Sequence, residues 1–112
     1  MNSDKFLQMI GLATKAGKTM SGEFSTEKAI QERKAKLVVV AEDASANTKK
    51  LFQNKCEFYK IPFMVYGDKV TLGRVTGHDT RASLAVTDEG FAKAMIKKQE
   101  AGNGTVNHNG GR

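Results

Sequence analysis

Hydrophobic residues recur along this chain at two spacings, and the spacing separates helices from strands. Apolar residues from Phe6 to Ala16 follow helical spacing, which predicts an amphipathic helix closed by Gly17. Residues 37–41, LVVVA, form a continuous apolar run flanked by charge, as is typical of a strand buried on both faces. The chain therefore combines helices with at least one interior strand.

Turn and capping residues predict the other elements. They are an edge strand at 18–21, an amphipathic helix from Gly22 to Arg33, a helix capped by Ser45, a strand at 63–66 after Pro62, a short helix to about Val75 that Gly77 ends, an alternating strand at 82–86, and a helix capped by Asp88. This alternation predicts an α/β fold, a three-layer α/β/α sandwich with a four-stranded mixed sheet. Residues 1–98 would form the domain, and 99–112, rich in Gly and Asn, a disordered tail.

Composition narrows the class of protein. A chain of 112 residues with 39% hydrophobic and 27% charged residues is typical of one soluble globular domain. The single cysteine, Cys56, excludes an internal disulfide, falls on the apolar stripe of its helix and fits a reducing compartment. The apolar stretch near the N-terminus is periodic and interrupted, unlike a signal peptide or a membrane span. We therefore expect a cytoplasmic protein that does not bind membranes.

The charge balance gives the first indication of function. The 18 Lys and Arg residues against 12 Asp and Glu residues give a formal net charge of +6, which favours polyanionic partners. A solvated surface that keeps the protein soluble is the alternative. Binding to a membrane surface is less favoured, because the basic residues are dispersed over several elements.

The segment GLATKAGKT at 11–19 resembles a phosphate-binding P-loop but departs from its spacing. Gly17, Lys18 and Thr19 fit the end of that motif, whereas Leu12 occupies the slot that requires the first glycine. A P-loop also follows a hydrophobic strand, and the residues before Gly17 have helical spacing. We therefore interpret Gly17 as a helix stop.

Other enzymatic chemistry is difficult to assemble from this sequence. Glu42 and Asp43 follow the central strand and are the best candidates for an acid, a base or a metal ligand, but no nucleophile or ligand set accompanies them. The alternative, which we favour, is that they begin a loop and help to cap a helix. With His78 and His108 as the two histidines and one cysteine, spacing assembles no metal site. We predict no catalytic residue and no cofactor.

Two turns that contain glycine are more informative. In MSGEFSTEKAI, Gly22 lies just before a helix N-terminus, where backbone amides and the helix dipole favour an anion such as an RNA phosphate. In LGRVTGHDTRASLA, Gly73 and Gly77 bracket a helix end, and a loop then leads into the last strand. The glycines of both turns could equally be ordinary turn residues.

Taken together, these segments resemble a known family. Lys28-Ala-Ile, the segment KAKLVVVAEDAS at 34–45, the stretch from Cys56 to Pro62, Leu72-Gly73 and Gly77 are similar to the ribosomal L7Ae family of kink-turn RNA-binding proteins, and GLATKAGKTMSGE resembles its bacterial YlxQ-like branch. The resemblance covers about residues 3–97 and implies an RNA-binding module of the α/β/α type.

The resemblance also implies site residues. In the family this helix begins Gly-Ala/Thr-Asn-Glu/Gln, its Asn and acidic residue read sheared G·A pairs, and a Lys four residues after the Asn contacts guanine and backbone. Gly22 and Lys28 match, whereas Phe24 and Ser25 occupy the slots of two polar readers. Glu23 could substitute through a local shift. Phe24 could stack on an unpaired base or pack on the core as a hydrophobic staple, and the sequence leaves both open.

A second contact is implied by the loop before the last strand, where the family covers a flipped-out nucleotide with small or apolar residues. Thr80, Arg81 and Ala82 match these positions. Arg81 departs from the pattern, and it could stack on a base, pair with a phosphate or be a solvent-exposed charge.

These observations predict a non-enzymatic RNA-binding protein for structured, kink-turn-like RNA such as rRNA, associated with the ribosome. Lys15, Lys18 and Lys36 would supply a supporting basic surface. The alternative is a protein-interaction module that keeps the scaffold and has lost specific kink-turn recognition. The RNA hypothesis requires the Gly22–Lys28 turn and the Thr80–Ala82 loop to lie at the same end of the sheet.

Overall fold

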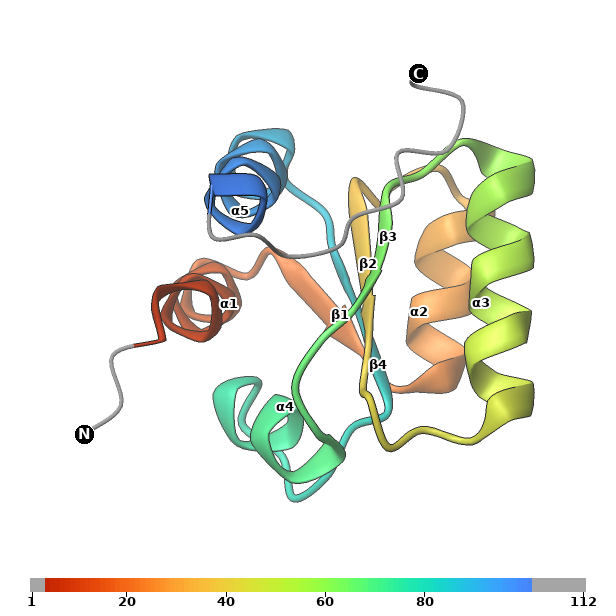
Figure 1. Cartoon of the computed structure of the whole chain (residues 1–112). Coiled ribbons are helices and arrows are strands. Elements are labelled where there is room, and N and C mark those ends of the chain that lie inside the picture. The colour runs from red at the N-terminus through yellow and green to blue at the C-terminus, as the bar shows by residue number, and fades with distance from the viewer. Residues whose placement is uncertain (1–3, 102–112) are drawn as a thin grey trace.

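The computed structural model of the protein describes residues 4–101 (Figure 1). Its helices are α1 (Lys5–Lys15), α2 (Glu23–Gln31), α3 (Ala46–Tyr59), α4 (Lys69–Val75) and α5 (Glu89–Ala101). Its strands are β1 (Thr19–Ser21), β2 (Leu37–Val40), β3 (Phe63–Val65) and β4 (Ser83–Val86). The predicted order of helices and strands is confirmed.

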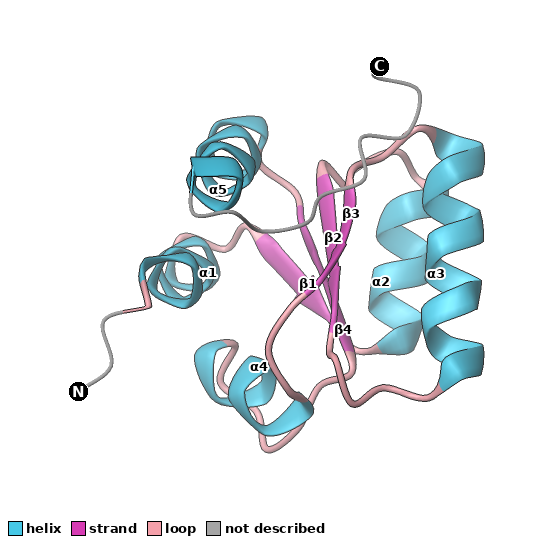
Figure 2. Ribbon diagram, viewed as in Figure 1, coloured by secondary structure: helices cyan, strands magenta, loops and turns pink. Residues whose placement is uncertain are grey.

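One four-stranded sheet with the order β1-β4-β2-β3 forms the middle layer. β4 is antiparallel to both β1 and β2, and β2 is parallel to β3, so the sheet is mixed as predicted. Helices α2 and α3 cover one face, and α1, α4 and α5 cover the other (Figure 2). The three-layer α/β/α sandwich is thus confirmed, with β1 at an edge.

Strand β4 lies between β1 and β2, and all four of its residues are buried. The strand predicted at 82–86 is confirmed, but the alternation of its residue types is not matched by alternating exposure, because both of its faces are buried. Its polar residue Ser83 does not face water, because its hydroxyl donates a hydrogen bond of 3.1 Å to the buried Thr26 Oγ1 on α2. In the sequence, a polar residue that is buried and hydrogen-bonded cannot be distinguished from an exposed one.

Helix α1 ends where the sequence predicted. Ala16 follows its last residue, and Gly17 has a φ of +75°, the left-handed conformation that closes a helix with little strain. The interpretation of GLATKAGKT as a helix end is confirmed. At the other end of the chain, α5 continues to Ala101, so residues 99–101 belong to a helix and not to the predicted tail. The prediction of disorder for the rest of the tail, including His108, lies outside the described residues.

Structural roles account for two of the candidate chemical residues. Cys56 is fully buried in α3, as its position on the apolar stripe predicted, and burial raises the pKa of its thiol to about 12. Asp43 binds through Oδ1 the backbone N–H of Lys69 at 2.9 Å, so its carboxylate fastens the loop after β2 to the start of α4. The helix that follows it, α3, is capped by Ser45 as predicted.

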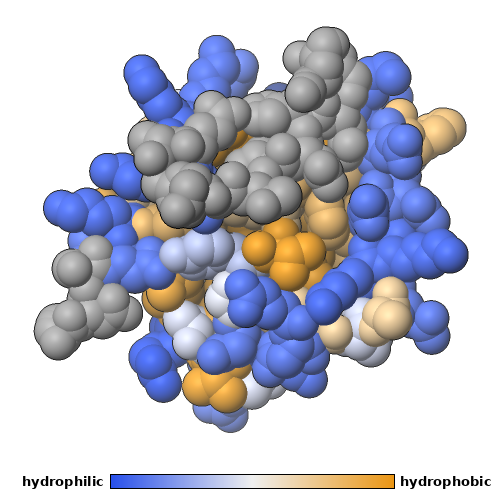
Figure 3. Space-filling model, viewed as in Figure 1, coloured by the Kyte–Doolittle hydropathy of each residue, from blue (hydrophilic) through white to orange (hydrophobic). Residues whose placement is uncertain are grey.

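The surface is predominantly hydrophilic in the view of Figure 3, where apolar side chains reach the surface only in small separate areas. No helix within residues 4–101 combines the length and the apolar composition that crossing a membrane requires.

Candidate functional site

The turn at Gly22 presents the N-terminus of α2. Gly22 has a φ of +95° and precedes the helix, and its own N–H donates to the carbonyl of Ser83 at 2.9 Å. Because Thr26 is the first residue to donate back to Gly22, the amides of residues 23–25 have no acceptor within the helix. These amides and the helix dipole favour a bound anion.

Arg81 joins this turn to the loop before β4. Its Nε donates to Ser21 Oγ at 3.1 Å and one terminal nitrogen donates to the Thr80 carbonyl at 3.0 Å. A Cβ added at Gly22 would lie 3.6 Å from Arg81 Nε, so the guanidinium packs against the glycine turn. Residues about 60 positions apart thus form one surface, at the end of the sheet where β1 finishes and β4 starts. We call residues 21–28 and 80–82 the rim.

Gly73 holds the loop of the rim in place. It lies inside α4 and is buried, and a Cβ there would approach the Asp79 carbonyl oxygen and Thr80 Cα to 2.6 Å. The helix ends at Val75, between Gly73 and Gly77, so the prediction that these glycines bracket a helix end is confirmed. Gly73 has a further role that the sequence did not indicate, because it allows this close approach of backbone. A further hydrogen bond, from Arg81 N–H to the Lys69 carbonyl at 3.0 Å, fixes the same loop on α4.

Phe24 points away from the protein interior, with 76% of its surface exposed. The hydrophobic-staple alternative is wrong, because the buried face of α2 consists of Thr26, Ala29 and Ile30, and Phe24 lies on the opposite side of the helix. Helical spacing relative to Ala29 and Ile30 was the signal that could have decided this from the sequence. An exposed phenylalanine beside a helix N-terminus is available for stacking on a base.

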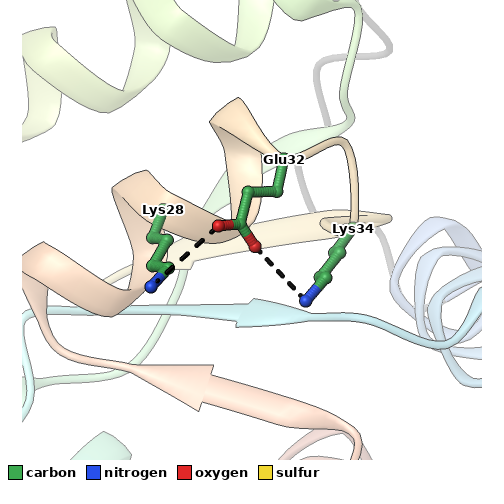
Figure 4. Close-up of polar contacts among 3 residues, drawn as sticks. All are labelled: Lys28, Glu32 and Lys34. Carbon is green, nitrogen blue, oxygen red and sulfur yellow. Dashed lines mark ion pairs between the residues drawn. The ribbon is translucent and has the colours of Figure 1, made fainter.

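Lys28 lies one turn after Phe24 and shares a shallow surface hollow with it. Its Nζ is 4.0 Å from Glu32 Oε2, and the other oxygen of that carboxylate is 3.2 Å from Lys34 Nζ (Figure 4). Both pairs are largely exposed, so each contributes little stability and Lys28 can exchange Glu32 for a phosphate at small energetic cost.

Beside the rim lies an open hollow of about 420 Å³ that the sequence did not reveal. Its lining contains hydroxyl side chains, one imidazole and one guanidinium, and no carboxylate. The lining residues are Thr14, Thr19, Met20, Ser21, Ser25, Thr76, His78 and Arg81. Hydroxyls with cationic or neutral nitrogen donors suit phosphate and ribose oxygens. These residues come from four separate segments, so no local sequence motif could have predicted the hollow.

The remaining predicted residues divide into two groups. Glu23 and Thr80 are exposed on the rim, whereas Ser25 and Ala82 are half-buried there. Lys15 lines a neighbouring hollow with Arg74 and Gly77, which shares Thr14 with the hollow beside the rim.

Lys18 and Lys36 lie at the other end of the sheet. The Lys18 carbonyl accepts from Thr87 N–H and Lys36 N–H donates to Val86, both at the end of β4 distant from Arg81. The prediction that these two lysines support the same surface is wrong.

The sequence pattern that defines the Ribosomal protein L7Ae/L30e/S12e/Gadd45 family matches residues 4–96. The chain belongs to this family. Among curated members, it is 42% identical over 96 residues to the RNA-binding protein YlxQ of Bacillus subtilis (strain 168), an alignment that covers 86% of this chain and 96% of that one. It is 39% identical over 92 residues to the RNA-binding protein YlxQ of Enterococcus faecium, covering 82% and 88%.

Two solved structures share the fold of this chain. A protein of unknown function from Bacillus halodurans C is 36% identical, with a TM-score of 0.81 over 85% of this chain and 96% of that chain. The Giardia lamblia 15.5kD RNA binding protein has a TM-score of 0.76 over 90% and 92% of the two chains, at 20% identity. The second likeness concerns the fold alone.

Proposed function

We propose that this member of the L7Ae family is a non-enzymatic RNA-binding protein that recognises structured, kink-turn-like RNA through the rim. The observation that carries the proposal is the junction of Arg81 with Ser21 and Gly22, which makes one surface out of two segments distant in sequence. The names of the two YlxQ relatives, both described as RNA-binding proteins, support the same partner.

Each part of the rim has a distinct task in this proposal. The amides at the start of α2 receive a phosphate, and Lys28 contacts a guanine edge or a second phosphate. Phe24 stacks on an unpaired base in the position where the family carries Asn. Arg81, already held by Ser21 through Nε and by the Thr80 carbonyl through one terminal nitrogen, directs its other terminal nitrogen at the nucleotide that the loop covers.

A titration with two RNAs tests the proposal. A standard kink-turn and an unrelated duplex of equal length present the same number of phosphates, so selective binding of the kink-turn measures recognition beyond charge. For either RNA, log affinity should fall with log salt by roughly 0.9 for each phosphate neutralised in a duplex. Equal affinity for both RNAs would reject kink-turn recognition, and the absence of binding to either would reject the whole proposal.

The aromatic contact has a matched control within the chain. Phe24 and Phe58 are exposed to the same extent, 76% and 77%, but Phe58 lies on α3, outside the rim. Phe24→Ala should weaken binding by about 1–3 kcal/mol if it stacks on a base, whereas Phe58→Ala should leave affinity unchanged. Equal effects of the two substitutions would remove Phe24 from the site.

Lys28 is tested in the same way against Lys97, an exposed lysine on α5. Lys28→Ala should cost about 1–3 kcal/mol of binding if Lys28 reaches a guanine edge, and Lys97→Ala should cost much less. We further propose that the RNA is ribosomal and the protein cytoplasmic, in keeping with its single, buried thiol. Cosedimentation with ribosomal subunits that the Lys28→Ala variant loses would support this location.

A further inference from the structure

A further hollow lies at the end of the sheet opposite the rim, between the C-terminal ends of α2 and α3 and the first half of α5. Its volume is about 360 Å³, within the range of pockets that hold ligands. It is lined by Ile30, Arg33, Ala35, Lys36, Tyr59, Lys60, Ile61, Pro62, Glu89, Ala92, Lys93 and Ile96. We call this hollow the groove. Neither the predicted site nor the proposed RNA interface uses it, apart from the misplaced Lys36.

The groove joins an aliphatic floor to a cationic border. Ile30, Ala35, Ile61 and Ala92 are buried beneath it, and four exposed cationic residues surround it. Its lining includes one carboxylate, Glu89, which lies 3.3 Å from Lys93 Nζ in an exposed pair. The border therefore carries an excess of positive charge that is not neutralised by the groove itself, so its complement is acidic.

Two of these cations occupy backbone conformations that are unfavourable for their residue type. Among residues 4–101, the non-glycine residues with positive φ are Arg33, at 61°, and Lys60, at 62°. Each follows the end of a helix, α2 or α3, where the left-handed position is normally filled by glycine. Glycine would relieve the strain but would remove a long cationic side chain from the border of the groove. Both departures from the usual helix end converge on the same hollow.

The chemistry of the lining favours a peptide over a nucleic acid. Bases in single-stranded sites need an open aromatic face and hydrogen-bonding side chains. The aromatic residue here is Tyr59, and the Arg33 guanidinium already lies 5.3 Å from the centre of its ring. Asn, Gln, Ser and Thr are absent from the lining. The aliphatic floor of the groove can receive an apolar side chain, and its cationic border can pair with carboxylates.

The chain's own C-terminal segment is a poor match for this surface. Residues 102–112, GNGTVNHNGGR, contain no Asp or Glu and include Arg112, so they bring no charge complementary to the border. Charge complementarity thus points to a different molecule.

We propose that the groove binds a short acidic segment of a partner protein, one that inserts an apolar side chain between flanking carboxylates. Bound at the end of the sheet distant from the rim, such a segment leaves the RNA surface free. The contact is small by the standard of stable complexes, so the interaction is of the weak, exchangeable kind.

Three synthetic peptides test this proposal by fluorescence anisotropy with the full chain. The probe is fluorescein-labelled DEDLFDED, its neutral counterpart is NQNLFNQN, and DEDAADED lacks the apolar anchor. The acidic, anchored peptide should bind about tenfold more tightly than either of the others, because it alone satisfies both border and floor. If DEDAADED bound as tightly as DEDLFDED, binding would depend on charge alone and the proposal would be overturned. The absence of any binding of DEDLFDED would also overturn it.

Substitution of Lys60 by glycine separates binding from folding. Lys60→Gly should raise the thermal midpoint, because glycine accepts a φ of 62° without strain, and should weaken DEDLFDED by about fivefold. Lys97→Gln on α5 removes the same charge outside the groove and should leave the peptide affinity within about twofold. A Lys60→Gly protein that is more stable and binds the peptide normally would show that the groove is not the site.

The same experiment tests the competing interpretation that the groove binds a nucleic acid. An RNA octamer of uridines should not displace the peptide, and Lys60→Gly should leave kink-turn affinity unchanged. Displacement by the octamer, together with loss of its binding in Lys60→Gly, would identify the groove as an RNA contact and overturn the peptide proposal. Because the peptide assay contains no structured RNA, its failure is distinguishable from failure of the proposed RNA function.

Discussion

The two ends of the sheet both present positive charge, but the cationic residues there differ in backbone conformation and in contacts. At the rim, the left-handed position is occupied by glycine, Gly22, and Arg81 is fixed by contacts to Ser21 and to the Thr80 carbonyl. At the groove, the left-handed positions are occupied by Arg33 and Lys60, with strained backbone and exposed side chains. The backbone of the rim is therefore unstrained and its arginine is held by hydrogen bonds. The backbone at the groove is strained, and its cationic side chains are exposed.

This difference predicts how each end tolerates change. Substitutions that unlock the rim should reduce stability and RNA binding together, since the same contacts position the loop and hold it to the fold. Substitutions at the groove should separate the two properties, because its charged residues contribute little to packing.

The largest effect is expected at Gly73. Gly73→Ala forces a Cβ against backbone of residues 79 and 80, so the loop must move and the free energy of unfolding should fall by about 1–3 kcal/mol. Chemical denaturation measures the loss, and kink-turn binding should fall with it while peptide binding at the groove persists. Gly11→Ala is the control: its nearest contact would be 3.8 Å away, and alanine in that helix should add about 0.5–1 kcal/mol. Loss of both binding activities in Gly73→Ala would contradict the independence of the two ends.

Alkaline pH should weaken both ends together, because they share one core. Burial raises the pKa of Cys56 from 9.0 to about 12, and burial with the nearby Asp4 raises that of Tyr66 from 10.0 to about 12. Both groups hold their protons more tightly in the folded chain, so their stabilising contribution is complete below pH 9 and is lost as pH rises from 9 to 12. Denaturation at successive pH values measures this decline.

Tyr66→Phe is the variant that isolates the tyrosine in this pH series. The decline of stability between pH 10 and 12 should become shallower, because phenylalanine has no proton to lose. Stability below pH 9 should fall slightly, since the hydrogen bond from Tyr66 to Asp4 is removed. An unchanged pH profile would show that Tyr66 does not contribute to the decline.

A smaller effect is expected where α2 is attached to β4 beneath the rim. Thr26→Val removes the acceptor of the buried Ser83 hydroxyl and should lower the free energy of unfolding by about 1 kcal/mol. The double variant Thr26→Val with Ser83→Ala removes both partners and should recover part of that loss, because no polar group is left unpaired. Additive losses in thermal or chemical denaturation would argue against the hydrogen bond as the cause.

The smallest effect concerns the competition for Lys28. Glu32→Gln removes the carboxylate that lies between Lys28 and Lys34, which should raise RNA affinity about twofold without altering peptide binding. Glu57→Gln, an exposed position on α3, makes the same change in net charge and serves as the control. Equal gains in both variants would indicate a general charge effect and no role for the Lys28 pair.

Features with a local cause were predictable from the sequence. The run LVVVA gave a strand buried on both faces, Ser45 capped α3, and Gly17 closed α1, because each depends on neighbours within one element. Strand β4 was predicted in its place, but the burial of both of its faces was not. Its Ser83 is satisfied by Thr26, 57 positions earlier, and no local pattern carries that pairing.

The site was predictable to a lesser degree, for the same reason. Resemblance to the family indicated both segments of the rim, but the contacts of Arg81 with Ser21 and of Gly73 with the loop depend on distant backbone. The groove was missed altogether, because its lining comes from the ends of α2 and α3, the residues that precede β2 and β3, and the first half of α5. The positive φ at Arg33 and Lys60 also leaves no signature in residue type.

The short length of β4 sets the distance between the two surfaces. Its four residues at about 3.3 Å each span roughly 13 Å, with the rim before the first and the groove beyond the last. A protein that binds RNA at the rim and a peptide at the groove would hold the peptide within a few nanometres of the folded RNA. That tether would give the segment's parent protein an effective concentration near the RNA on the order of millimolar.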